Sequence, residues 1–257
     1  MTWRHVAGLT DSMMWEGHSV ISHYDEAPEW LFDEIRHAGV DYSDPRIAEE
    51  YDAHHTRFRD YEKDARLIIE RLGLKTHHTV IDLGCGTGAF VLTAAKVCRR
   101  VHAVDVSTAM LGLLSNKAQQ IGLKNIETHH AGFLTYEHED EPADAVVSVA
   151  ALHHLPDFWK AVAFKRMHEM LTPGGKLYLF DVVFAFDIDG YAAELSDWVS
   201  VMARSGTPAM AQETVVHIRD EYSTFDWVIE GMLTRAGFSI GEKHSDFPRT
   251  IAYICVR

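Results

Sequence analysis

The stretch Val80-Ile81-Asp82-Leu83-Gly84-Cys85-Gly86-Thr87-Gly88 decides how this chain folds. A short apolar run leads into an acidic residue, and three glycines then follow at alternate positions before a segment of helical character. A buried strand that enters a glycine loop and then a helix forms a nucleotide-type pocket, because the loop backbone can approach a ligand where a Cβ atom would clash. Asp105 closes the next apolar run, where a carboxylate would accept hydrogen bonds from two ribose hydroxyls.

Apolar runs and helical segments alternate from residue 79 onward. Strands separated by helices imply right-handed crossovers and a mostly parallel sheet covered on both faces, so the predicted fold class is α/β and doubly wound. We expect strands at 79–83, 100–105, 125–130, 143–149 and 175–183, helices at 46–72 (in two pieces), 88–97, 107–121, 158–170 and 222–236, and closing strands at 238–240 and 251–256.

The glycine loop is compatible with two cofactors. Gly84, Gly86 and Ala89 satisfy the G-x-G-x-x-A pattern of dinucleotide-binding proteins. Asp82 opposes that interpretation, because a carboxylate would repel a pyrophosphate but would attract the ammonium group of an amino-acid-like ligand. Gly88 adds a third alternate glycine, giving the string D-L-G-C-G-T-G over residues 82–88.

That string resembles the first motif of the class I S-adenosylmethionine-dependent methyltransferases. Residues 143–149 and 151–155, the turn at 171–177 and the segment 235–238 resemble later motifs of the same family in the same order. The resemblance spans roughly residues 45–257 and implies a seven-stranded sheet with an antiparallel last strand. It also implies S-adenosyl-L-methionine as methyl donor and S-adenosyl-L-homocysteine as product. In one departure, the family usually has Gly-Asp after the third strand, and this chain has Gly132-Phe133.

The resemblance also implies a set of site residues along the carboxyl ends of the strands. The implied donor contacts are Tyr51, Asp82, Gly84, Cys85, Gly86, Gly88, Asp105, Val106, Met110, Gly132, Phe133, Val149 and Ala150. Tyr42 and Tyr61 compete with Tyr51 for the aromatic place over the donor. His153 and His154, just after the fourth strand, are either general bases or structural residues.

Two segments rich in aromatic residues flank the expected core. We predict four parts: an N-terminal segment (1–45), the donor-binding core (46–183), an inserted helical lid (184–220) and a completion of the sheet (221–257). The first and third would close over the pocket and exclude water. The candidate acceptor contacts are Trp15, Trp30, Asp181, Phe184, Phe186, Tyr191 and Trp198.

Composition narrows the range of partners. The net charge of −14 over 257 residues argues against nucleic acid, whose binding depends on Lys and Arg, and favours a small-molecule acceptor. No membrane span or signal peptide is expected, and three scattered cysteines indicate a reducing cytoplasm. The 17 histidines include four adjacent pairs, but neighbours on a strand point to opposite faces, so no metal site is expected.

The sequence therefore predicts methyl transfer to a small molecule by in-line displacement. An NAD-dependent oxidoreductase and a non-catalytic module that binds the donor or a partner are the alternatives. A tRNA or protein acceptor, and assembly as monomer or homodimer, stay open.

Overall fold

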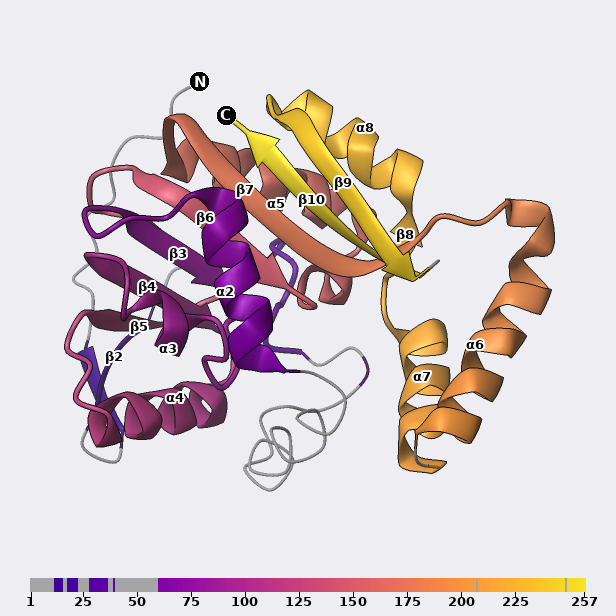
Figure 1. Cartoon of the computed structure of the whole chain (residues 1–257), viewed down its shortest axis with the longest axis horizontal. Coiled ribbons are helices and arrows are strands. Elements are labelled where there is room, and N and C mark those ends of the chain that lie inside the picture. Colours follow the sequence, from indigo (N-terminus) through magenta and orange to yellow (C-terminus); the bar gives the residue numbers. More distant parts are fainter. Residues whose placement is uncertain are drawn as a thin grey trace.

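The computed structural model describes residues 12–15, 18–22, 28–36, 39, 60–206, 208–247 and 249–257. Its centre is a twisted sheet (Figure 1) in which seven strands lie in the order β5 (Ile126–His130), β4 (Arg100–Asp105), β3 (Thr79–Leu83), β6 (Ala143–Val149), β7 (Leu171–Phe184), β10 (Thr250–Val256) and β9 (Ser239–Phe247). The first five are parallel, and β10 runs antiparallel to both β7 and β9. The predicted doubly wound sheet with an antiparallel last strand is confirmed.

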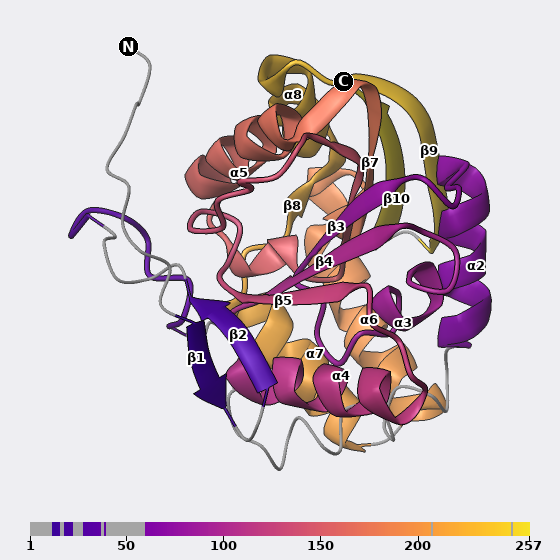
Figure 2. The same cartoon turned by 90° about the vertical axis from the view of Figure 1, so that its left-hand side faces the viewer.

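Helices cover both faces of this sheet (Figures 1 and 2). On one face, α2 (Tyr61–Leu72), α3 (Val91–Ala94) and α4 (Thr108–Gln120) pack against Val80, Val101 and Ala103. On the other, α5 (Asp157–Met170) and α8 (Asp226–Ala236) pack against Ile81 and Leu83. Because every residue of β3 is buried, its sequence is not an alternation of apolar and polar residues but a continuous run of buried ones.

The helix ends follow from local chemistry. Asp60 accepts a hydrogen bond from the Lys63 amide at the start of α2, and Gly73 ends that helix in a left-handed conformation. Ser107 caps α4 through the Met110 amide, as its position after Asp105 predicts. Two helices differ from expectation: α3 is much shorter than the predicted 88–97, and residues 46–59 of the predicted 46–72 lie outside the described residues.

The described part of the N-terminal segment adds two strands that the sequence does not predict. β1 (Ser12–Trp15) and β2 (His18–Ser22) form an antiparallel hairpin, and β2 continues the sheet beside β5 through Ile21 and Ser22 (Figure 2). β1 pairs only with β2 among the described strands, and β2 pairs with β5, a strand more than 100 residues away in the sequence. Such pairing leaves no local apolar alternation, which explains why the pattern of residues 1–40 gives no sign of these strands.

The insertion after β7 is helical. It comprises η2 (Ile188–Gly190), α6 (Tyr191–Ser205) and α7 (Pro208–Asp220), and it stands beyond the end of β7 in Figure 1. The chain returns through β8 (Thr224–Phe225), which pairs with the last two residues of β7. Across the described ranges, none of these or the other helices combines the length and apolar character needed to cross a membrane.

Candidate active site

A cavity of about 190 Å³ lies at the carboxyl ends of β3, β4, β5 and β6. This is the edge at which open α/β sheets bind ligands. Eleven residues of the implied donor site line the cavity: Asp82, Gly84, Cys85, Gly86, Asp105, Val106, Met110, Gly132, Phe133, Val149 and Ala150. The sheet thus brings together side chains that are up to 68 positions apart in the sequence.

The glycine loop is fastened to β4 on one side and open to the cavity on the other. The amides of Gly84 and Cys85 both donate to the Val104 carbonyl, over 2.9 and 3.0 Å. Gly86 has φ +53°, and a Cβ atom there would project into open space. A ligand can therefore approach the backbone at Gly86 closely.

Gly88 serves packing and does not line the cavity. A Cβ atom at this position would lie 2.2 Å from Cδ1 of Leu114, so its absence lets α4 approach the loop. The implied contact of Gly88 with the donor stays a prediction.

Asp105 is held rigidly by backbone amides. Its Oδ2 accepts from Gly86 over 2.7 Å, and its Oδ1 accepts from Ser107 over 2.8 Å. Burial raises the pKa of this carboxyl, and the hydrogen bonds from Ser107, Gly86 and Val106 offset part of the rise. Each carboxylate oxygen has a second lone pair, so the fixed side chain can still accept from two adjacent hydroxyls.

Asp82 is fully enclosed below the loop. Burial, and then the nearby charge of Asp105, raise its pKa to about 8. Among the described residues no donor or cation offsets this rise. A buried carboxylate in this state gains from a positive ligand, and S-adenosylmethionine carries both an ammonium and a sulfonium group. The acidic cavity therefore fits the donor that the sequence motif implies.

Glu34 is a cavity residue that the sequence analysis missed. Its Oε1 accepts from the Leu134 amide over 2.9 Å and from the Thr135 hydroxyl over 3.2 Å, while its Oε2 is buried without a hydrogen-bond partner among the described residues. A Cβ atom on Gly132 would lie 2.4 Å from that oxygen. Burial raises the pKa of Glu34 to about 7. The carboxylate that this chain lacks at position 133 is thus present beside Gly132, supplied from 100 residues upstream.

His153 and His154 occupy different environments. His154 lines the cavity, together with Ala151 and Leu155. His153 is buried behind it, with Nδ1 2.5 Å from Oδ1 of Asp181 and Nε2 3.4 Å from Oε2 of Glu221. Burial alone would lower the pKa of His153, but the charges and hydrogen bonding of these carboxylates hold it above its ordinary value. Both ring nitrogens of His153 thus face carboxylates, and the side chain does not line the cavity, so a role as general base stays a prediction.

Six of the candidate acceptor residues do not line the cavity: Trp30, Asp181, Phe184, Phe186, Tyr191 and Trp198. Trp30 and Tyr191 are mostly exposed, and Phe184 packs on Phe186 and Trp198. The side chain of Trp15 and the whole of Tyr42 and Tyr51 fall outside the described residues, whereas Tyr61 lines the cavity from α2. The other lining residues not expected from sequence are Arg36, Asp64, Ala65, Ile68, Thr87, Ala89, Phe90, Ser107 and Ala131. Most of them adjoin the glycine loop or the strand ends. The sequence pattern therefore predicts the region in which they lie, but not which of its residues line the cavity.

Comparison with known proteins agrees with this geometry. A family model described as a methyltransferase domain matches residues 80–175. An uncharacterized methyltransferase from Anoxybacillus flavithermus is 26% identical over 197 residues, which are 75% of this chain and 86% of the relative. The (S)-tetrahydroprotoberberine N-methyltransferase of Eschscholzia californica is 24% identical over 172 residues, which are 65% of this chain but only 48% of that longer enzyme.

Solved structures share the fold. The N-methyltransferase NodS from Bradyrhizobium japonicum, determined with S-adenosylhomocysteine, aligns with a TM-score of 0.59 at 19% identity. The alignment covers 82% of this chain and 95% of NodS. With the glycine loop and the acidic cavity, the family match identifies residues 80–175 as a methyltransferase domain with S-adenosylmethionine as its cofactor, and the solved structures share its fold.

Proposed function

We propose that this enzyme methylates a small molecule that binds beside His154, at the end of β6. The supporting observation is the shape of that end of the cavity. Ala150 adopts φ +54° although it is not glycine, and its amide donates to the Phe180 carbonyl over 2.7 Å. This turn places Ala151, His154 and Leu155 against the cavity, and Ala151 lies so close to the glycine loop that a Cβ atom on Gly84 would be 2.3 Å from its own. Such backbone strain is concentrated at functional sites.

Donor recognition in this proposal uses three carboxylates. Asp105 accepts from the ribose hydroxyls, Asp82 attracts the ammonium end, and Glu34 accepts from the adenine amino group. When bound, the donor supplies a methyl group that is already electrophilic on its sulfonium. The protein then needs to hold the acceptor in line with the C–S bond, and orientation can provide most of the acceleration. Met110, Phe133 and Val149 would contribute apolar contacts around the adenine and the donor.

The acceptor is enclosed, in this proposal, by the two flanking segments. They meet beside His153: Glu221, at the end of the insertion, faces its Nε2, and the Tyr222 amide donates to the His153 carbonyl over 2.8 Å. Gly39 of the N-terminal segment lies so close that a Cβ atom would be 2.0 Å from Oε1 of Glu221. His153 is then a positioning residue that ties both segments to the turn carrying His154.

A small acceptor also agrees with the charge of the protein. A polyanion would need a basic surface, and the net charge is −14. Among the described residues, the lining of the cavity holds four acidic side chains (Glu34, Asp64, Asp82 and Asp105) and one arginine, Arg36. This balance favours neutral or cationic acceptors such as amines.

The test is transfer of labelled methyl from S-adenosylmethionine into separated fractions of a cell extract. We expect label in the low-molecular-mass organic fraction, dependent on the enzyme and lost with Asp105→Ala. Label confined to protein or RNA would overturn the small-molecule assignment. Donor binding without transfer to any fraction would favour a non-catalytic module.

A further inference from the structure

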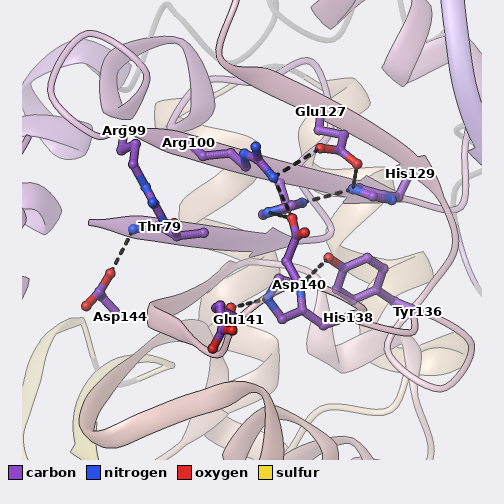
Figure 3. Close-up of polar contacts among 11 residues, drawn as sticks. Thr79, Arg99, Arg100, Glu127, His129, Tyr136, His138, Asp140, Glu141 and Asp144 are labelled. Carbon is purple, nitrogen blue, oxygen red and sulfur yellow. Dashed lines mark hydrogen bonds and ion pairs between the residues drawn. The ribbon is translucent and has the colours of Figure 1, made fainter. Parts of the chain in front are cut away.

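A second polar cluster occupies the face of β4 and β5 that is covered by residues 131–142. His102 of β4 lies directly opposite Glu127 of β5, and the next pair on the same face is Val104 with His129. Because residues two apart on a strand share a face, His102, Glu127 and His129 point to the same side of the sheet. Figure 3 shows the Glu127 carboxylate between His129 and Arg100, with Arg100 also reaching the Asp140 carboxylate. None of these residues lines the donor cavity.

The three side chains already have the spacing of metal ligands. Nδ1 of His102 lies 3.1 Å from Nε2 of His129, and that nitrogen lies 3.7 Å from Oε1 of Glu127. All three ligand atoms lie within 4.8 Å of one another. Two imidazole nitrogens bound at about 2.0–2.1 Å to tetrahedral zinc are roughly 3.3 Å apart, so the histidine pair needs almost no adjustment. Glu127 is 40% exposed, and a rotation of its side chain can bring the carboxylate closer.

The surroundings of His102 orient its ring toward the other two ligands. The side chain is 2% exposed. Its Nε2 has no hydrogen-bond partner among the described residues and lies 3.5 Å from Oδ2 of Asp140. A proton on Nε2 would face that carboxylate and leave the Nδ1 lone pair directed toward His129. Carboxylate, histidine and ion are arranged in this way around many protein metals.

Charge and access also suit an ion. Arg100 lies 2.6 Å from Asp140 and 4.0 Å from Glu127, and it balances only part of their combined charge. A groove of about 490 Å³, lined by Arg100, Glu127 and Asp140 among others, opens the cluster to solvent. An ion can therefore enter without passing through the methyltransferase cavity.

We propose that His102, Glu127 and His129 bind one divalent transition-metal ion, zinc in the first place, with Asp140 orienting His102. The donor set of two imidazoles and one carboxylate matches that ion, and water can complete the coordination. The ion would join β4 to β5 beneath residues 131–142 and act as a structural element. The sequence analysis expected no metal because adjacent histidines diverge; this site instead combines His102 and His129 from neighbouring strands.

The test is titration of the chelator-treated, full-length protein with zinc chloride by calorimetry, and with cobalt(II) by visible absorption. We expect one ion per chain and tetrahedral cobalt bands. His129→Gln and Glu127→Gln should weaken zinc binding by about 100-fold or more, and Asp140→Asn by about tenfold. His130→Gln is the matched control, since this neighbour on the same strand points to the other face.

One further variant, His217→Gln, makes the result decisive. His153, His217 and Glu221 form the other group in the described chain with metal-ligand spacing. Zinc binding lost in His217→Gln but retained in His129→Gln would overturn the assignment, as would absence of stoichiometric binding or binding unaffected by any variant. Thermal melts of the metal-free variants and their titration with S-adenosylhomocysteine verify that they fold. If His129→Gln does not fold, Glu127→Gln still tests the site, because the Glu127 side chain is partly exposed.

Discussion

The amide of Gly86 donates to Oδ2 of Asp105 over 2.7 Å, joining the glycine loop after β3 to the end of β4. The same carboxylate accepts from Ser107 through its other oxygen. The loop and the carboxylate proposed to bind the ribose therefore form one unit, and the loop conformation depends on Asp105 even before a ligand arrives.

Asp105→Ala should weaken binding of S-adenosylhomocysteine by roughly 1–3 kcal/mol, since hydrogen bonds to the ribose are lost and two amides lose their acceptor. Calorimetric titration measures this loss. Glu139→Ala, an exposed acidic residue outside the cavity, is the control and should bind normally. Unchanged affinity in Asp105→Ala would show that the ribose lies elsewhere.

Glu34→Ala should lower the affinity for S-adenosylhomocysteine by about 1 kcal/mol, because the adenine amino group loses a buried acceptor. An analogue with hypoxanthine in place of adenine has no amino group at that position. It should bind wild type weakly and lose little further affinity in the variant. An equal loss for both ligands would mean that Glu34 supports the fold of the cavity rather than recognising the base.

Asp82→Asn should make the ligand-free protein more stable at neutral and alkaline pH. Burial raises the pKa of Asp82 from 3.8 to about 8, so between these values the folded chain holds a proton that the unfolded chain has released. Stability from this group is complete below about pH 4 and is lost as the pH rises toward 8.

Thermal melts at pH 5 and pH 8 provide the comparison. Between pH 5 and pH 8 the Tm of the wild type should fall further than the Tm of the variant. At pH 8 the Tm of the variant should be the higher by at least roughly 3 °C. The same variant should bind the donor more weakly. Parallel pH profiles for the two proteins would contradict the role of Asp82.

Gly88→Ala should destabilise the protein by roughly 1–3 kcal/mol, because the new Cβ atom meets Leu114 and the left-handed backbone resists a side chain. Gly122→Ala separates the two causes: Gly122 has φ +73° but open space around it. Urea denaturation should show the larger loss for Gly88→Ala, and Gly88→Ala should cost less in a Leu114→Ala background than in the wild type. Equal losses at the two glycines would rule out the clash.

Prediction from sequence was strongest where local chemistry and tertiary structure agree. The β3 run, the glycine loop, Asp105 and the Ser107 cap occur within 30 residues of one another, so their spacing in the sequence predicts the fold. Glu34 carries no such signal, since its partners Leu134 and Thr135 are 100 residues away and its own segment lacks periodicity.

The aromatic residues show a second limit of sequence patterns. Phe184, Phe186 and Trp198 suggest an acceptor site by type, but they pack on one another and on Phe225 beyond β7. Composition alone does not distinguish aromatic side chains that bind a ligand from those that cover each other.

The position of Glu34 has a thermodynamic consequence. The segment 28–36 lies outside the 80–175 methyltransferase domain, yet it supplies the carboxylate beside Gly132. If adenine binds to Glu34, ligand occupancy and docking of this segment are reciprocally linked: each must strengthen the other by the same free energy. Cofactor saturation would then act at a distance on the first part of the chain, and protection of that part from proteases would rise with donor concentration.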